Sequence, residues 1–195
     1  MIQNTNQPHN APIYICCYDS PLGKMILASD GTFLTGLWFE GQKYACALVN
    51  QAVAEGKPVV KVDEEQHADS LRIFNQTKCW LDLYFSGVCP DFTPPLKVEG
   101  SAFRQLIAEI MLTISYGQTM TYGEIGKIAA ERLGKKTMSA QAVGGAVGHN
   151  PISLIIPCHR VVGSDGSLTG YAGGIDKKRA LLELESQLGK QEKSL

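Results

Sequence analysis

The chain has 195 residues, of which 44% are hydrophobic and 19% charged, a balance typical of a folded globular protein. Its formal net charge of −1 excludes attraction of a polyanion by bulk charge, so any nucleic-acid contact must come from a local patch. No apolar stretch reaches the roughly 18–20 residues of a membrane helix, and the polar start predicts no signal peptide. The six cysteines contain no Cys-x-x-Cys pair, so we expect a cytoplasmic protein without a metal site or a disulfide framework.

Three short runs rich in β-forming residues lie between residues 13 and 39. The last two are separated by Asp30-Gly31, the strongest short hairpin signal, and together the runs predict an antiparallel meander. Apolar residues near helical spacing then predict a helix over residues 67–86 that covers the sheet. Glycines and prolines end this pattern, so we expect a first α/β domain, with a disordered start, over residues 1–97.

Residues 98–195 are predicted to form a second, largely helical domain. Apolar spacing after Ser101 predicts one helix, and the capping box from Thr121 to Glu124 begins a second. A basic loop leads to a short third helix over residues 139–148. This order is typical of a helix-turn-helix in which the third helix is the recognition helix.

The third helix has an unusual composition. Gly144 and Gly145 each cost a helix roughly 0.8–1.0 kcal/mol relative to alanine, and with Ala140 and Gln141 they leave one face nearly smooth. Two interpretations remain open. The smooth face either packs tightly against another helix or lies against a partner's backbone, as in the narrow (~6 Å) minor groove of DNA.

A candidate nucleophile follows an apolar run. Residues 152–156 are predicted to form a buried strand that ends in Pro157-Cys158-His159. A cysteine near a base can act as a nucleophile, because the base favours the reactive thiolate. Neighbouring residues of an extended chain point to opposite faces, however, so adjacency does not imply contact. From these residues alone, a structural buried cysteine is the commoner outcome.

The sequence around Cys158 resembles one family. The segment Pro157–Val161, together with Ala142–Ala146 and Gly170–Gly174, is similar to the O6-alkylguanine-DNA alkyltransferases (methylated-DNA–protein-cysteine methyltransferases). The likeness is specific over residues 94–187, whereas the first domain fits only in pattern. It implies an α+β fold with a ribonuclease H-like N-terminal domain and a winged-helix-like helix-turn-helix C-terminal domain. It also implies a monomeric DNA-repair protein that needs no cofactor.

The resemblance implies a role for five residues. Cys158 would accept the alkyl group irreversibly from O6 of guanine, or from O4 of thymine. His159, oriented by Glu185, would remove the thiol proton through a water molecule. Asn150 would tie the recognition helix to the cysteine segment, and Tyr122 would crowd a phosphate, promote rotation of the target nucleotide and protonate the leaving guanine. Taken alone, Glu185 would be predicted to be solvent exposed and Tyr122 to be a packing residue.

The resemblance also implies a pocket and a DNA-binding surface. The target base would be flipped out of the duplex, because O6 cannot otherwise reach a thiol. The pocket would be lined by Val161, Tyr171, Ala172 and Gly173. Double-stranded DNA would bind through its minor groove to Tyr122 and to the third helix, at Ala140, Gln141, Gly144 and Gly145.

Two positions depart from the family pattern. Gln141 stands where the family often has an arginine that fills the gap left by the flipped base, so we expect weaker DNA affinity or slower flipping. Ala172 stands where some members have serine. Two other functions remain open: a sensor that binds alkylated DNA without transfer, as relatives lacking the cysteine do, and a Cys–His hydrolase.

Overall fold

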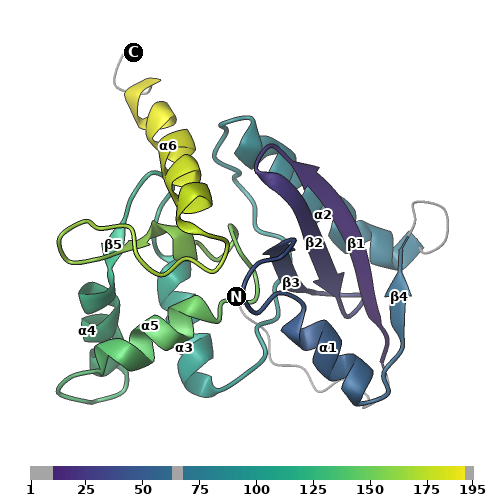
Figure 1. The fold of residues 1–195 in the computed structure, drawn as a ribbon, viewed down its shortest axis with the longest axis horizontal. Helices are drawn as coiled ribbons and strands as arrows, with labels where there is room; N and C mark the ends of the chain where they lie inside the picture. Colours follow the sequence, from purple (N-terminus) through teal and green to yellow (C-terminus); the bar gives the residue numbers. More distant parts are fainter. Residues whose placement is uncertain (1–10, 63–67, 192–195) are drawn as a thin grey trace. The chain divides into compact units, whose positions relative to one another are not determined.

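The chain divides after Glu99 into two compact units (Figure 1). The structure is a computed structural model, and it describes residues 11–62 and 68–191. Residues 1–10, for which the sequence predicts a disordered start, lie outside the described part.

The first unit contains the predicted meander. Strands β1 (Ile13–Ser20), β2 (Gly23–Ser29) and β3 (Leu34–Phe39) pair antiparallel in chain order. A fourth strand, β4 (Val59–Lys61), pairs parallel with β1 and gives the sheet order β3-β2-β1-β4. The sequence does not predict β4, because a three-residue strand carries no readable alternation.

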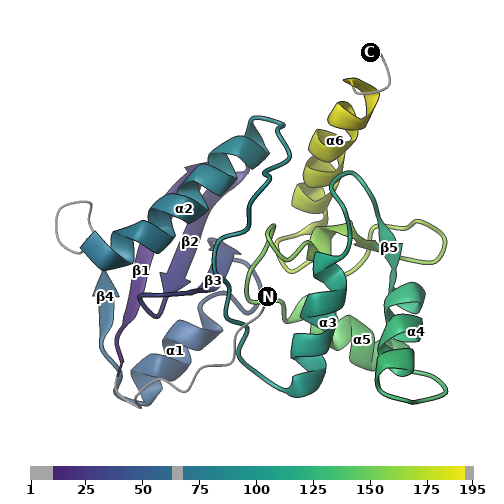
Figure 2. The same cartoon turned by 180° about the vertical axis from the view of Figure 1, so that it is seen from behind.

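Two helices complete the first unit. Helix α2 (Ala68–Phe85), predicted over residues 67–86, contacts β1, β2 and β3 and covers one face of the sheet (Figure 2). Helix α1 (Ala47–Ala54) contacts β4 and is not predicted. The core between the sheet and α2 is large and apolar, and its fully buried side chains include Trp38, Phe74, Leu81 and Tyr84. This unit is organised around ordinary hydrophobic burial.

The second unit is built on the three predicted helices. Helices α3 (Ala102–Leu112), α4 (Tyr122–Arg132) and α5 (Ala140–Gly148) contact one another pairwise. Two begin at predicted caps, because Ser101 accepts a backbone N–H at the start of α3 and Thr121 with Glu124 forms the complete capping box of α4. Ser139, expected as the first residue of the third helix, is instead its N-cap and accepts the N–H of Ala142. Helix α6 (Ile175–Gln191) follows. Among the described residues, no helix is long and apolar enough to cross a membrane.

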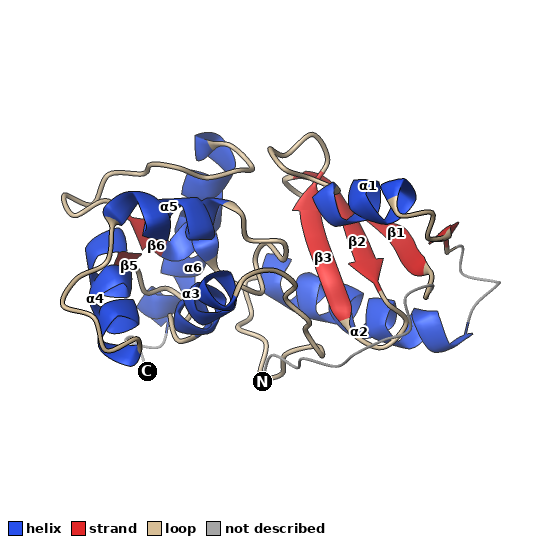
Figure 3. Ribbon diagram, turned by 90° about the horizontal axis from the view of Figure 1, so that it is seen from below, coloured by secondary structure: helices blue, strands red, loops and turns tan. Residues whose placement is uncertain are grey.

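A short parallel ladder fixes where α4 begins. Strand β5 (Met120–Thr121) pairs with β6 (Val161–Val162), and Figure 3 shows these strands among the helices of the unit. The 3₁₀ turn η1 (Cys158–Arg160) directly precedes β6 and contacts α6. The ladder therefore brings Tyr122, the first residue of α4, beside the segment that carries Cys158.

Candidate active site around Cys158

The segment before Cys158 is not a strand, and the prediction of one over residues 152–156 is wrong. The apolar side chains are buried as expected, but the backbone forms turns, and Leu154 has a positive φ of 68°. Cys158 itself begins the 3₁₀ turn η1. Cys158 and His159 are therefore not neighbours in an extended chain, and the expectation that their side chains point to opposite faces does not hold for them.

The Asn150 side chain holds this irregular segment together. Its Nδ2 donates to the carbonyls of Ile156 (2.7 Å) and Ile152 (3.1 Å), and its Oδ1 accepts the N–H of Ile152 (3.1 Å). These hydrogen bonds satisfy backbone groups that would pair with a neighbouring strand if the segment were extended. The same Nδ2 lies 3.1 Å from Cys158 Sγ. Asn150 follows His149, the C-cap of α5, so one buried amide links the end of that helix to the sulfur.

A buried ionic cluster lies beside the cysteine. Glu185, on α6, accepts from His159 Nε2 at 2.7 Å and from Arg160 Nε and Nη2 at 2.9 and 3.0 Å. Its carboxylate also accepts the backbone N–H of Gly117 (3.1 Å). Only 1% of Glu185 is exposed, so its prediction as a solvent-exposed residue, made from the local sequence alone, is wrong. Arg160 continues the network by donating to the carbonyl of Ile114 (2.6 Å).

These contacts set the charges at neutral pH. Although burial raises it, the pKa of Glu185 falls to about 2 because His159 and Arg160 bond to its carboxylate. Burial lowers the pKa of His159 below its ordinary value of 6.5, against the opposing effect of Glu185. His159 is therefore neutral at pH 7. An ionised Glu185 accepts from Nε2–H, which leaves Nδ1 as the basic nitrogen of the ring.

The sulfur is held as a thiol at rest. Burial raises the pKa of Cys158, and the Asn150 amide and the Lys178 ammonium oppose that rise. Cys158 is 7% exposed. Both opposing groups favour the thiolate, so they stabilise the state that a nucleophilic attack requires.

Lys178 is a site residue that sequence reasoning missed. Its side chain is fully buried, and Nζ donates to the carbonyls of Val161 (2.6 Å) and Thr169 (2.8 Å). A signal was present: Lys178, Leu181 and Glu185 follow helical spacing, so a buried Leu181 places both charged residues on the inward face of α6. Lys178 thereby joins β6 to the loop that leads into α6.

That loop carries the predicted pocket residues. Tyr171 is buried, and Ala172 and Gly173 are half-buried. Burial raises the pKa of both Tyr171 and Tyr122, and negative charge on Cys158 adds to that rise. Tyr122 Oη donates to the Thr169 carbonyl at 3.2 Å. The structure thus brings Tyr122, the loop and Cys158 together around β6.

The predicted recognition helix presents its smooth face to open space. Ala140, Gln141 and Gly145 are exposed, and a Cβ added at Gly144, Gly145 or Gly148 would meet no atom within 4 Å. Tight helix packing therefore does not explain these glycines. By contrast, a Cβ at Gly126 on α4 would contact Val143 at 3.6 Å.

The remaining cysteines show no ligand geometry. Within residues 11–62 and 68–191, no group of three or more His, Cys, Asp or Glu side chains is placed to hold a metal ion. Cys16 is buried in β1, Cys17 is exposed, and all six cysteines are free thiols. His9 could in principle join Cys16 and Cys17 in holding zinc, but their spacing matches no zinc pattern, and His9 lies outside the described residues.

Comparison with known proteins covers both units. The family described as "6-O-methylguanine DNA methyltransferase, ribonuclease-like domain" matches residues 13–98, and the corresponding "DNA binding domain" matches residues 102–187. The chain is 40% identical over 174 residues to a Haemophilus influenzae methylated-DNA–protein-cysteine methyltransferase, covering 89% of this chain and 86% of the relative.

Two solved structures have the same fold. The Mycobacterium tuberculosis O6-methylguanine methyltransferase superposes with a TM-score of 0.71 at 38% identity, over 90% of this chain and 93% of that one. The M. tuberculosis OGT in complex with DNA gives a TM-score of 0.67 at 38% identity, over 89% and 93%. The α+β fold predicted from the sequence is thereby confirmed.

Proposed function

The chain belongs to the 6-O-methylguanine DNA methyltransferase family, and on that premise we propose that Cys158 accepts the alkyl group from O6 of guanine. The chain binds DNA and repairs it by alkyl transfer, as a methylated-DNA–protein-cysteine methyltransferase. The observation that carries the proposal is the surroundings of one thiol. Cys158 Sγ accepts a hydrogen bond from the Asn150 amide, and the Lys178 ammonium favours its thiolate. The next residue in the chain, His159, is paired with Glu185.

The proposed step is a displacement at the alkyl carbon. The bond from Cys158 Sγ to carbon forms while the bond from that carbon to O6 breaks. The thiol proton passes through a water molecule to Nδ1 of neutral His159, whose Nε2–H is held by Glu185. The leaving guanine takes a proton from the phenol of Tyr122, a residue that the β5–β6 ladder brings beside the segment carrying Cys158.

The product accounts for a single turnover. A thioether is neutral and has no good leaving group, so Cys158 is not regenerated. Each molecule therefore reacts once. O4-alkylthymine presents an equivalent leaving oxygen, so it can serve as a second substrate.

Base flipping and minor-groove binding complete the proposal. The open glycine face of α5 supports close approach to DNA, because small side chains suit the narrow groove. A flipped base would enter between Tyr122 and the loop at Tyr171–Gly173. The Val161 carbonyl already accepts from Lys178, but a carbonyl oxygen has a second lone pair with which to read guanine. Action as a monomer in the cytoplasm stays part of this proposal.

The stoichiometry of repair tests the proposal. The protein is titrated with a duplex that contains one O6-methylguanine, and the restored guanine is counted per molecule of protein. We expect one guanine per molecule, with no further conversion on longer incubation. A damage sensor would bind and restore none, whereas a hydrolase would continue to turn over, and either result would overturn the proposal.

A further inference from the structure

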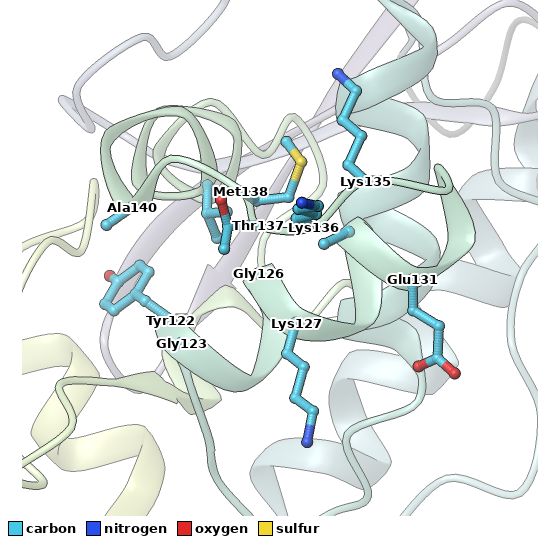
Figure 4. A pocket seen from close by; sticks show the side chains of 12 residues that line it. Tyr122, Gly123, Gly126, Lys127, Glu131, Lys135, Lys136, Thr137, Met138 and Ala140 are labelled. Atoms are coloured by element: carbon cyan, nitrogen blue, oxygen red, sulfur yellow. The ribbon is translucent and has the colours of Figure 1, made fainter.

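A cleft lies between α4, α5 and the loop that joins them. It has a volume of about 570 Å³, and Figure 4 shows the side chains that line it. Its floor is apolar and includes Gly126, Ala130 and Val143. Cys158 does not line this cleft, which meets the chemical centre only at Tyr122.

The rim of the cleft is positively charged. Lys127, Lys135 and Lys136 line it and are exposed, against one acidic residue, Glu131. In Figure 4, Lys127 and Lys135 extend in opposite directions from the cleft. Three cations against one carboxylate form a local positive patch on a chain whose formal net charge is −1.

The cleft is continuous with the surface proposed to bind DNA. Tyr122 and Ala140 belong to that surface and also line the cleft. The remainder of the surface supplies no cation. Helix α5 contains no charged residue, and the first turn of α4 carries the exposed carboxylate of Glu124, which accepts the N–H of Thr121 at 2.7 Å. The charge that holds a phosphate backbone must therefore come from outside α5 and the first turn of α4.

We propose that this cleft binds the sugar–phosphate backbone of the DNA strand that runs alongside α5. Lys135 and Lys136, with Lys127, pair with phosphates, and the apolar floor contacts a deoxyribose. Such contacts position the duplex without reading its sequence. They supply the charge that is missing at Gln141. This inference rests on the proposed function, because it takes α5 and Tyr122 as the DNA-binding surface.

The salt dependence of DNA binding tests the proposal. The double variant Lys135→Gln/Lys136→Gln is compared with wild type on an unmodified duplex between 50 and 200 mM NaCl. Loss of two phosphate contacts should make the slope of log K against log salt shallower by about 1.8. Between 50 and 200 mM NaCl, the factor by which affinity falls should therefore be roughly 12-fold smaller for the variant than for wild type. A slope equal to that of wild type would overturn the proposal.

A matched control removes two positive charges outside the cleft. Arg132 pairs with Glu109 of α3 at 3.7 Å, and Arg179 is exposed on α6; neither lines the cleft. The variant Arg132→Gln/Arg179→Gln should keep the wild-type slope. If it loses as much slope as the cleft variant, bulk charge explains the effect and the cleft does not bind DNA.

Glu131 offers a test of opposite sign. Replacing this carboxylate by the neutral amide, Glu131→Gln, should strengthen DNA binding because it removes repulsion of the phosphates. Weaker or unchanged binding contradicts the proposal. Failure of the proposed function would look different: wild-type protein would restore no guanine in an O6-methylguanine duplex, whatever the salt slope.

Discussion

Each of the two units buries one cysteine thiol to nearly the same extent. Cys16 of β1 is 6% exposed and Cys158 of η1 is 7% exposed. Burial raises the pKa of both thiols, for Cys16 to about 12, against a lowering charge from Lys78. The two thiols differ in their hydrogen-bond partners. The side-chain amide of Asn150 lies 3.1 Å from Cys158 Sγ, and the same amide bonds to the buried backbone just before Cys158. Burial alone therefore does not distinguish a structural cysteine from a reactive one.

The polar content of the two cores differs in the same way. The first unit buries a lysine, Lys97, in an ion pair with Asp30 at 3.2 Å. The second unit buries His159, Arg160, Lys178 and Glu185 around one turn of chain. Burying charged groups is unfavourable unless they are paired and hydrogen-bonded. A concentration of such groups beside one sulfur points to chemistry, whereas the Lys97–Asp30 pair of the first unit has, within the described residues, no cysteine among its hydrogen-bond and ion-pair partners.

The largest expected effect separates the two thiols. Cys158→Ala should abolish alkyl transfer, because no other sulfur has the same neighbours, while Cys16→Ala should leave transfer by the folded protein at the wild-type level. Both are measured as methyl groups transferred per molecule from an O6-methylguanine duplex. Residual transfer by the Cys158 variant, or loss in the Cys16 variant alone, would reverse the comparison.

The next effect concerns the buried cluster. Glu185→Gln should lower the free energy of unfolding by about 3 kcal/mol, because Arg160 stays charged and buried without its carboxylate. Urea denaturation measures this change. Asp176→Asn on the same helix is the matched control. The Asp176 side chain is fully exposed, so the free energy of unfolding should not change. Equal stability of the two variants would show that the cluster does not stabilise the fold.

The pH dependence of stability should differ between its acid and alkaline arms. Folding lowers the pKa of His159 below 6.5 and that of Glu185 from 4.5 to about 2, so the unfolded chain binds more protons and stability falls on acidification through these ranges. Folding raises the pKa of Cys16 and Cys158 above 9.0, so stability also falls as pH rises beyond about 9. Urea midpoints across pH should show a plateau between about 6.5 and 9. A gain in stability from pH 7 to pH 5 would contradict these assignments.

The smallest effect trades stability against binding. Gly145→Ala should raise the free energy of unfolding by about 1 kcal/mol, since alanine favours a helix and the added methyl meets open space. The same methyl should weaken DNA binding, because it protrudes from the surface proposed to approach the groove. Denaturation and a binding titration on one sample measure both. A variant that is more stable and binds DNA equally well would remove the glycine face from the interface.

Local signals predicted much of the fold. The hairpin at Asp30-Gly31 and the caps at Ser101 and Thr121 depend on neighbouring residues, and the corresponding elements form. The segment over residues 152–156 could not be predicted in this way. Its apolar run is typical of a strand, but the Asn150 side chain satisfies the backbone groups that a ladder would otherwise bond.

The site was predictable only in part for a similar reason. The resemblance, carried by three short segments between residues 142 and 174, supplies the candidate residues Cys158, His159, Glu185, Asn150 and Tyr122. The burial of Glu185 depends on Arg160, 25 residues away in the chain, and no local pattern indicates that pairing. Lys178 was missed because a lysine on a charged helix is ordinarily exposed, and only the inward spacing with Leu181 and Glu185 marks it.

The most direct measurement of the central claim identifies the sulfur that carries the alkyl group. The protein is incubated with an O6-methylguanine duplex, digested, and mapped by mass spectrometry across all six cysteines. The account predicts one added methyl group, replacing one hydrogen, on the peptide that contains Cys158 and on no other. A methyl group on Cys16 or on an exposed cysteine, with the Cys158 peptide unchanged, would contradict it.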